Sequence, residues 1–423
     1  MNRALAIIDG EHYPPVVQDA LATLPYDFGG AWLVGGKEKL RGDDEYGVPL
    51  FDELERALAE LEPDVVVDLS DEPVLGPRER FRVASRVLAH GIPYVGPDFR
   101  FDPPELQPFD LPSIGIVGTG KRVGKTAVAG HALRLFAQDR DVVVVAMGRG
   151  GPPEPEVERA SPTLERLLEL SRNGRHAASD YLEDAAFGGV DAIGSRRCGG
   201  GLAGAVATSN VAEGARLALE RGADLVIFEG SGAAFPPIAT ARRILVANSS
   251  IEPALLTGYL NTYRVLVSDL VVLTGAEEGS RHDELRAAVD EVKPNLTVVA
   301  TEMRPRPAEP VEGKRVAVFT TAREETHERL ARLLAEEHRA EVVHVSGNLA
   351  DREKLRADLE SVDADTFLIE IKAAAIEVVA EAAKERGAEC VFLDNDVLPL
   401  EGEPDLDTEL KALAEAAQKE PVA

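Results

Sequence analysis

The sequence predicts an α/β fold in which helices cover mainly parallel sheets. Short runs of Val, Ile and Leu that end in Gly, Asp or Ser alternate with Ala-, Leu-, Glu- and Arg-rich segments of helical period. The chain has 423 residues, which is too long for one ordinary hydrophobic core. Its 44% hydrophobic and 28% charged residues are typical of a globular protein. We therefore expect two or three packed domains.

The first domain is expected to be a small, Rossmann-like α/β unit spanning residues 1–108. Its expected strands are Ala4–Ile8, Asp64–Leu69 and Tyr94–Val95, and its expected helices are Pro15–Thr23, Phe51–Leu61 and Glu79–His90. A stretch rich in proline, residues 96–112, follows. Proline lacks the N–H donor and restricts φ, so this stretch indicates a domain boundary.

The second domain is expected to span residues 109–303 and to hold a parallel sheet. Its expected strands are Ile114–Val117, Asp141–Met147, Asp224–Phe228, Ile244–Ala247, Asp269–Leu273 and Thr297–Thr301. A second proline-rich stretch, Met303–Pro310, indicates the next boundary. The remaining α/β segment, residues 304–423, is either a third domain or an extension of the second. Its expected strands are Arg315–Thr320, Glu341–Val345, Thr366–Ile371 and Cys390–Asp394.

Charge and cysteine content exclude several classes of function. The formal net charge of −28 argues against nucleic acid or an anionic membrane as a partner. We expect neither a signal peptide nor a membrane-spanning segment, since no apolar run approaches the required ~20 residues. Cys198 and Cys390 lie far apart in the sequence, so a disulfide framework is not expected and the reducing cytoplasm is favoured. We expect Cys198 to be a small packed residue.

The segment from residue 118 to 126 predicts a site for a nucleoside triphosphate. It lies between an expected strand and an expected helix and consists of Gly118, Thr119, Gly120, Lys121, Arg122, Val123, Gly124, Lys125 and Thr126. Glycines let backbone N–H groups converge on phosphate oxygens, Lys125 can reach the β- and γ-phosphates, and Thr126 can bind Mg²⁺. Thr119 stands where the usual P-loop pattern has glycine, and this variant resembles the loop of dethiobiotin-synthetase-like NTPases.

Glu229 is the second predicted part of this nucleotide site. It ends an apolar strand and precedes Gly230-Ser231-Gly232, so a parallel sheet would place it beside the phosphate loop. There it could bind Mg²⁺ directly or through water. A strand-ending carboxylate that caps a helix is the alternative. The Glu-Gly pair also resembles the same NTPase group.

Several cationic side chains at expected loop positions predict a pocket for a polyanionic substrate. The candidates, with the glycines that expose backbone donors, are Arg149, His176, Arg196, Arg197, Gly199, Gly200, Arg242 and Arg243. Each arginine alone could be a solvated surface charge. His176 fits a structural role as well as a catalytic one. Two acidic N-terminal segments, Asp9–Tyr13 and Asp68–Pro73, either cap helices, hold a second cation or close over the substrate.

These strings together resemble the cyclic 2,3-diphosphoglycerate synthetase family over nearly the whole chain. The resemblance rests on Ile8–Tyr13, Asp68–Pro73, Gly118–Thr126, Ala146–Gly151, His176–Asp180, Arg196–Gly201, Glu229–Gly232, Ile371–Ala375 and Asp394-Asn395. It implies ATP-dependent closure of 2,3-diphosphoglycerate into a cyclic phosphoanhydride, with release of ADP and phosphate. It also implies a cytoplasmic homodimer, and leaves open whether K⁺ is required.

The predicted catalytic residues are Lys125, Glu229, Arg149, Lys121 and His176, with Thr126 and Glu229 as metal ligands. A phosphate oxygen is already an anion and needs no strong general base, so countercharge is the main requirement. Three alternatives remain open. They are a 2-phosphoglycerate kinase activity, a dethiobiotin-synthetase-like ligase acting on a carboxylate or carbamate, and a non-catalytic nucleotide-binding regulator.

Overall fold

The computed structural model describes residues 1–35, 46–159, 161–277 and 280–419. They form two compact units. The first comprises Met1–Pro104, Glu252–Val267 and Glu284–Asn295, and the second comprises Glu105–Ile251, Ser268–Asp283 and Leu296–Ala423. Both units are built of strands and helices in alternation, which confirms the predicted α/β class. No helix of the described residues is both long and apolar enough to cross a bilayer.

The first unit has a six-stranded sheet with strand order β3-β2-β1-β4-β5-β6. Its elements are β1 (Arg3–Asp9), α1 (Pro14–Thr23), β2 (Asp27–Val34), β3 (Leu50–Phe51), α2 (Leu54–Leu61), β4 (Val65–Asp68), α3 (Pro77–Ala89), β5 (Tyr94–Val95), β6 (Arg100–Phe101), α8 (Pro253–Leu256), α9 (Asn261–Leu266) and α10 (His282–Val292) from its third residue on. Helix α9 packs against α3, where the rings of Phe81 and Tyr259 lie 5.6 Å apart. Two segments from the middle of the chain therefore complete the N-terminal unit.

Strand β2 was not predicted, because two glycines interrupt its apolar pattern. Packing requires at least one of them. A Cβ on Gly30 would lie 2.8 Å from the Phe51 ring and 2.9 Å from the Leu61 side chain. The tertiary structure therefore places glycine in a strand that local propensity disfavours.

The second unit has a thirteen-stranded sheet whose strands run in the order β11-β10-β8-β12-β7-β13-β14-β15-β19-β18-β16-β17, with β9 paired to β10. Its strands and first helices are β7 (Ser113–Gly118), α4 (Lys125–Phe136), β8 (Val142–Gly148), β9 (Glu156–Glu158), α5 (Leu164–Arg172), α6 (Asp180–Gly188), β10 (Asp191–Cys198), β11 (Thr208–Ser209), α7 (Val211–Arg221), β12 (Leu225–Glu229), β13 (Arg242–Asn248) and β14 (Leu270–Thr274). The later elements are β15 (Val298–Pro307), β16 (Arg315–Phe319), α11 (His327–His338), β17 (Glu341–Ser346), α12 (Arg352–Ser361), β18 (Thr366–Ile369), α13 (Glu381–Arg386), β19 (Glu389–Pro399) and α14 (Leu406–Lys419).

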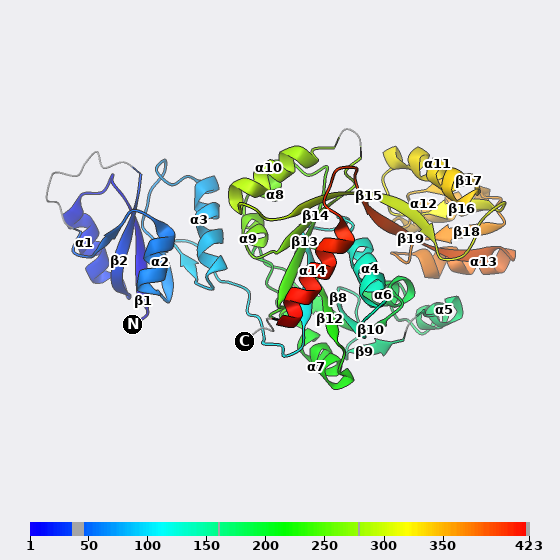
Figure 1. Ribbon diagram of the computed structural model, residues 1–423, viewed down its shortest axis with the longest axis horizontal. Coiled ribbons are helices and arrows are strands. Elements are labelled where there is room, and N and C mark those ends of the chain that lie inside the picture. The colour runs from blue at the N-terminus through cyan, green and yellow to red at the C-terminus, as the bar shows by residue number, and fades with distance from the viewer. Residues whose placement is uncertain (36–45, 160, 278–279, 420–423) are drawn as a thin grey trace. The chain divides into compact units, whose positions relative to one another are not determined.

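Strands β10, β8, β12, β7, β13 and β14 are mutually parallel, so their carboxyl ends share one edge of the sheet. Helices cover both faces. Val142 and Val144 pack in the cluster that includes α4 and α6, whereas Val143 and Val145 pack in the cluster that includes α7. The C-terminal helix α14, red in Figure 1, packs against β7, β13 and α4. The last helix of the chain thus supports the strand and helix on either side of the predicted phosphate loop.

The first half of the proline-rich stretch that we expect to mark the second domain boundary lies within a strand. Strand β15 runs to Pro307, and its second half pairs with β19 in antiparallel register from Thr301 opposite Pro399 to Pro307 opposite Leu393. β14 pairs only with the first half of β15. The prolines therefore occur where β15 has one neighbour and needs donors on one side only. The sheet is continuous into the C-terminal segment.

Candidate nucleotide and anion site

The predicted phosphate loop connects β7 to α4 and contains two residues in the left-handed region. Arg122 and Gly124 have positive φ, 58° and 77°. A Cβ on Gly124 would approach Thr274 to 2.9 Å, so glycine is required here both for its φ and for space. Helix α4 begins at Lys125, and the free N–H groups of its first turn and its dipole favour an anion.

Lys125 forms a buried ion pair with Glu229. Its Nζ contacts Oε1 of Glu229, and the exposed fractions of the two side chains are 9% and 0%. Burial opposes the charge on Lys125, but Glu229, Asp180 and Asp184 together raise the pKa of Lys125 above its ordinary value. The sheet explains the encounter, because β12 is hydrogen-bonded to β7 with Glu229 opposite Ile116.

Two further buried carboxyl groups of α6 lie in this region. Burial and then the negative charge of Glu229 raise the pKa of Asp184 well above its ordinary value. Burial also raises the pKa of Glu183, to about 8, against the opposing effect of Lys372. Lys372 Nζ lies 3.3 Å from Oε1 of Glu183. Among the described residues no group of three or more His, Cys, Asp or Glu side chains is arranged to hold a metal ion.

Arg197 is anchored next to the nucleotide loop. Its Nη2 donates to the Ser231 carbonyl oxygen at 2.9 Å, and its Nη1 donates to that of Gly199 at 2.6 Å. The Gly118 N–H in turn donates to the Gly232 carbonyl oxygen at 3.1 Å. Burial and the like charge of Arg149 lower the pKa of Arg197. The segment after Glu229 therefore joins the phosphate loop to the arginine.

Arg149 and His176 belong to the same edge of the sheet. Arg149 directly follows β8, whose Gly148 is opposite Arg196 of β10. The side chain of His176 covers Gly150, where an added Cβ would meet its ring at 2.2 Å. Ser179 Oγ donates to the Gly150 carbonyl oxygen at 3.1 Å. The loop that carries Arg149 is thus held by the residues that begin α6.

Some predicted site residues are separated from this group. Arg242 and Arg243 begin β13, with Arg242 opposite Ile114, so they lie at the amino end of the sheet while the phosphate loop lies at the carboxyl end. Our expectation that these two arginines join the substrate pocket is wrong for this reason. Arg196 and Arg197 end a strand and are not in a loop, and successive strand side chains face opposite sides. Arg196 is exposed.

Three further residues of the sequence analysis lie at the surface. Lys121 and Arg122 are exposed, and their roles stay predictions. Cys198 is exposed rather than packed, because it ends β10 next to the exposed glycines Gly199 and Gly200.

The aspartates that begin the two acidic N-terminal segments accept hydrogen bonds from neighbouring residues. Asp9 accepts from the backbone N–H groups of Glu11, His12 and Asp71 at 2.7–3.2 Å. Asp68 accepts from Ser70, Arg80 and Tyr94. These carboxylates stabilise turns at the end of β1 and β4, which favours the structural alternative for both loops.

Comparison with known proteins agrees with this architecture. Three family models match successive parts of the chain: the N-terminal domain of cyclic 2,3-diphosphoglycerate synthetase at residues 3–102, its P-loop domain at 113–302 and its C-terminal domain at 307–396. The chain belongs to the cyclic 2,3-diphosphoglycerate synthetase family.

Named relatives are similar over almost their full length. Cyclic 2,3-diphosphoglycerate synthetase of Rubrobacter xylanophilus is 48% identical, with 98% of each chain covered. The protein of that name from Thermococcus kodakarensis is 42% identical, with 94% of this chain and 95% of the relative covered. Among solved structures, LpxK from Aquifex aeolicus in complex with ATP matches with a TM-score of 0.43 and 14% identity, over 74% of this chain and 90% of that chain.

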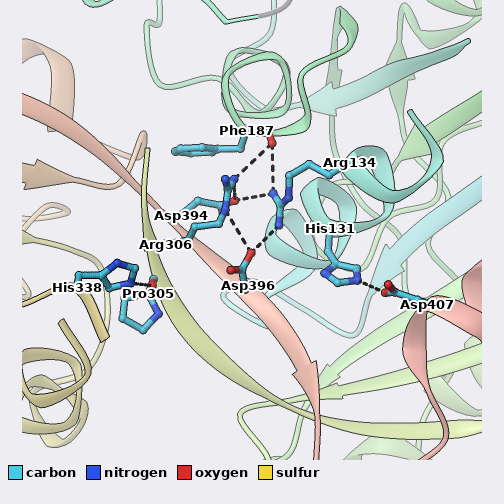
Figure 2. Close-up of polar contacts among 9 residues, drawn as sticks. All are labelled: His131, Arg134, Phe187, Pro305, Arg306, His338, Asp394, Asp396 and Asp407. Atoms are coloured by element: carbon cyan, nitrogen blue, oxygen red, sulfur yellow. Dashed lines mark hydrogen bonds and ion pairs between the residues drawn. The ribbon is translucent and has the colours of Figure 1, made fainter. Parts of the chain in front are cut away.

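Two of the strings that carry the family resemblance come from the C-terminal segment and contact the P-loop domain. One contains Lys372, the partner of Glu183. The other contains Asp394, which accepts from Arg134 of α4 and Arg306 of β15, both at 2.9 Å. Figure 2 shows these two arginines converging on Asp394 and Asp396. Both strings therefore belong to contacts of α4 and α6, the helices beside the phosphate loop.

Sequence reasoning missed Asp184, Glu183, Lys372 and Ser231. One available signal was the i, i+4 spacing of Asp180 and Asp184, which places both on one helix face. No local pattern pairs Glu183 with Lys372, which lies far away in the sequence.

Proposed function

We propose that this chain catalyses the ATP-dependent conversion of 2,3-diphosphoglycerate to its cyclic phosphoanhydride, with release of ADP and phosphate. Family membership supports this reaction. The single structural observation that carries it is the bridge from the phosphate loop to Arg197 through residues 229–232. This bridge supports the proposal that Arg197 binds the anionic acceptor, because it ties Arg197 to the segment that also contacts the phosphate loop.

The nucleotide is proposed to bind over the phosphate loop, residues 118–126. The N–H groups of the loop and of the first turn of α4 contact the phosphates, and Lys125 neutralises the β- and γ-phosphates. Lys125 must first leave Glu229, since one ammonium cannot serve both partners fully. Binding of ATP is therefore an exchange of ion-pair partners.

The residues also fit Mg²⁺, because Oε2 of the fully buried Glu229 has no hydrogen-bond partner among the described residues. Thr126, in the first turn of α4, and Glu229 would hold the ion. When bound, Mg²⁺ would neutralise charge on the phosphates. The need for K⁺ stays open.

The acceptor is proposed to bind between Arg149 and Arg197, with His176, Gly199 and Gly200 beside them. Guanidinium groups bind phosphate oxygens bidentately and offset the repulsion between two polyanions. Arg196 precedes Arg197 on β10, so its exposed side chain faces the other side of the strand and is not part of the proposed pocket. Lys121 and Arg122 extend from the phosphate loop and are proposed to contact the γ-phosphate from the solvent side.

The reaction is proposed to occur in two transfers. An oxygen of one substrate phosphate attacks the γ-phosphorus of ATP, and the bond to the β-phosphate oxygen breaks to release ADP. The neighbouring substrate phosphate then attacks the inner phosphorus of the new pyrophosphoryl group. Inorganic phosphate leaves and the ring closes. The second step is intramolecular, so holding the two substrate phosphates at attack distance accelerates it.

We also propose finer features that follow from the family resemblance. The protein acts as a cytoplasmic homodimer on a small polyanion and not on nucleic acid. It is divided functionally into residues 1–108, 109–303 and 304–423. Light scattering on the purified full chain would give a mass of twice 45.3 kDa for this assembly, and a monomer mass would contradict it.

The test of the function is direct. The enzyme is incubated with Mg²⁺, ATP and 2,3-diphosphoglycerate, and the products are followed by ³¹P NMR. An upfield anhydride resonance that belongs to no nucleotide is expected, together with equal amounts of ADP and phosphate. ATP hydrolysis without that resonance, or ATP binding without turnover, would contradict the proposal. The same experiment with 2-phosphoglycerate in place of 2,3-diphosphoglycerate tests the kinase alternative, which predicts ATP-dependent phosphorylation of 2-phosphoglycerate.

A further inference from the structure

Three buried carboxylate oxygens near the phosphate loop have no hydrogen-bond partner among the residues that the structure describes. They are Oδ1 and Oδ2 of Asp184 and Oε2 of Glu229. The exposed fractions of these two residues are 1% and 0%. Buried carboxylates normally accept several hydrogen bonds or face a cation. Three such oxygens in one place point to a missing positively charged ligand.

Asp184 and Glu229 face the same space from two elements. Helix α6 packs on α4 and on β8, and β12 is the neighbour of β8 in the sheet. Among the charges that act on Asp184, those of Glu229 and then Lys125 are the largest. Lys125 is ion-paired with the other oxygen of Glu229, Oε1. Lys125 is therefore ion-paired with Glu229 and is also the positive charge that acts most strongly on Asp184.

Glu183, the residue before Asp184, is a buried carboxyl group of the same helix that does have a partner. Its exposed fraction is 5%, but its Oε1 has Lys372 Nζ at 3.3 Å. Asp184 has no such hydrogen-bonded partner among the described residues, although Asp184 is the more deeply buried of the two. Of these two neighbouring acidic residues of α6, Asp184 is therefore the one without a hydrogen-bond partner among the described residues.

We propose that Asp184 and Glu229 together bind a divalent cation that the nucleotide phosphates complete. This inference deepens the proposed function and rests on it, since the phosphates supply the remaining ligands. Mg²⁺ binds in this manner, with one or two carboxylates plus phosphate oxygens. Thr126, in the first turn of α4, would be the third protein ligand of the same ion.

The cation also explains how Lys125 is released. Glu229 holds Lys125 when no cation is present. A divalent cation between Asp184 and Glu229 supplies the countercharge that both carboxylates need, and Lys125 is then free for the phosphates. Metal and nucleotide binding are therefore expected to strengthen each other.

The test measures metal binding and not turnover. The full chain is titrated with Mn²⁺ in the presence of a non-hydrolysable ATP analogue, and free Mn²⁺ is followed by electron paramagnetic resonance. Asp184→Asn is expected to weaken Mn²⁺ binding by about tenfold or more. The control, Glu213→Gln, changes an exposed carboxylate of α7 and is expected to stay within about threefold of the wild type. Equal Mn²⁺ affinity in Asp184→Asn and the wild type would overturn the proposal.

A second measurement separates metal binding from folding. In EDTA, Asp184→Asn is expected to bind the analogue at least as tightly as the wild type does, because Asp184 is proposed to act on the nucleotide only through the cation. If Asp184→Asn no longer binds the analogue in EDTA, Asp184 only supports the fold, and the proposal is overturned. If Asp184→Asn does not fold, anomalous diffraction locates Mn²⁺ in crystals of the wild type with the analogue. Anomalous density in contact with the carboxylates of Asp184 and Glu229 is expected. Anomalous density in contact with the phosphates alone would overturn the proposal.

The two proposals fail in different ways. If the wild type produces the anhydride resonance and Asp184→Asn keeps its metal affinity, only the metal assignment is wrong. If the wild type binds Mn²⁺ through Asp184 but produces no anhydride, the assignment holds and the proposed reaction is wrong.

Discussion

Arg134 of α4 donates from Nη1 to Oδ2 of Asp394 on β19 at 2.9 Å, across 260 positions of sequence. Arg306 of β15 donates to the same oxygen at 2.9 Å. Asp394 has a side-chain exposed fraction of 6% and is the shared partner of two arginines. The helix that follows the phosphate loop is thereby fastened to the C-terminal segment, as Figure 2 shows.

The first prediction concerns this junction. Asp394→Asn is expected to lower the free energy of unfolding by about 2 kcal/mol, because the two guanidinium groups lose the more buried of the two carboxylates that they share. Urea unfolding followed by circular dichroism measures the change. Glu213→Gln removes one partner of an exposed pair on α7 and serves as the control, with no measurable shift expected. Equal urea midpoints for Asp394→Asn and the control would contradict the role of the junction.

The second prediction concerns Lys125. Lys125→Ala is expected to lower turnover by about 10³-fold, since the charge that develops on the transferred phosphoryl group loses its buried countercharge. The rate of formation of the ³¹P anhydride signal measures this loss. Lys121→Ala, in which an exposed side chain of the same loop is removed, is expected to cost much less. A comparable loss in both variants would mean that the loop acts through its overall charge and not through Lys125.

The third prediction separates the two adjacent arginines of β10. Arg197→Ala is expected to raise KM for 2,3-diphosphoglycerate by about tenfold or more and to change KM for ATP little, because a charged hydrogen bond is lost on the acceptor side. Arg196→Ala is the matched control, since its exposed side chain faces the other side of the strand. Steady-state kinetics with each substrate varied in turn gives both constants. An unchanged KM for 2,3-diphosphoglycerate in Arg197→Ala would place the acceptor elsewhere.

The fourth prediction concerns the two cysteines. Burial, with smaller effects of Glu309 and Glu389, raises the pKa of Cys390 to about 12. A raised pKa keeps the thiol protonated, so at pH 8 only about one Cys390 in ten thousand is the reactive thiolate. Cys198 is exposed. Iodoacetamide at pH 8 is therefore expected to modify Cys198 first, and peptide mass spectrometry reads out the order. Faster labelling of Cys390 would show that β19 opens in solution.

Features encoded within a few neighbouring residues could be predicted from the sequence. The phosphate loop is one, because a buried strand, a glycine-rich turn and an apolar helix follow one another without a break from β7 to α4. Glu229 is another, because a carboxylate at the end of an apolar strand must lie at the carboxyl edge of a parallel sheet. Arg149 was placed by the same reasoning.

Other predictions failed because they treated a local signal as sufficient. Arg242 and Arg243 begin β13 and so lie at the opposite edge of the sheet from Gly118. The domain boundary expected at the prolines after residue 303 stays a prediction. Strand β15 runs through residues 303–307 because it has a partner on only one side there and tolerates proline.

By itself, the sequence determined the α/β class, the nucleotide loop and the family, since each depends on the order of residue types along a short segment. Only the tertiary structure decided that Lys125 pairs with Glu229, that Arg197 and not Arg196 reaches Ser231, and that Arg134 shares Asp394 with Arg306. The physical reason is that the order of parallel strands brings together side chains that are far apart in sequence, and burial then makes each charge depend on the partner it finds.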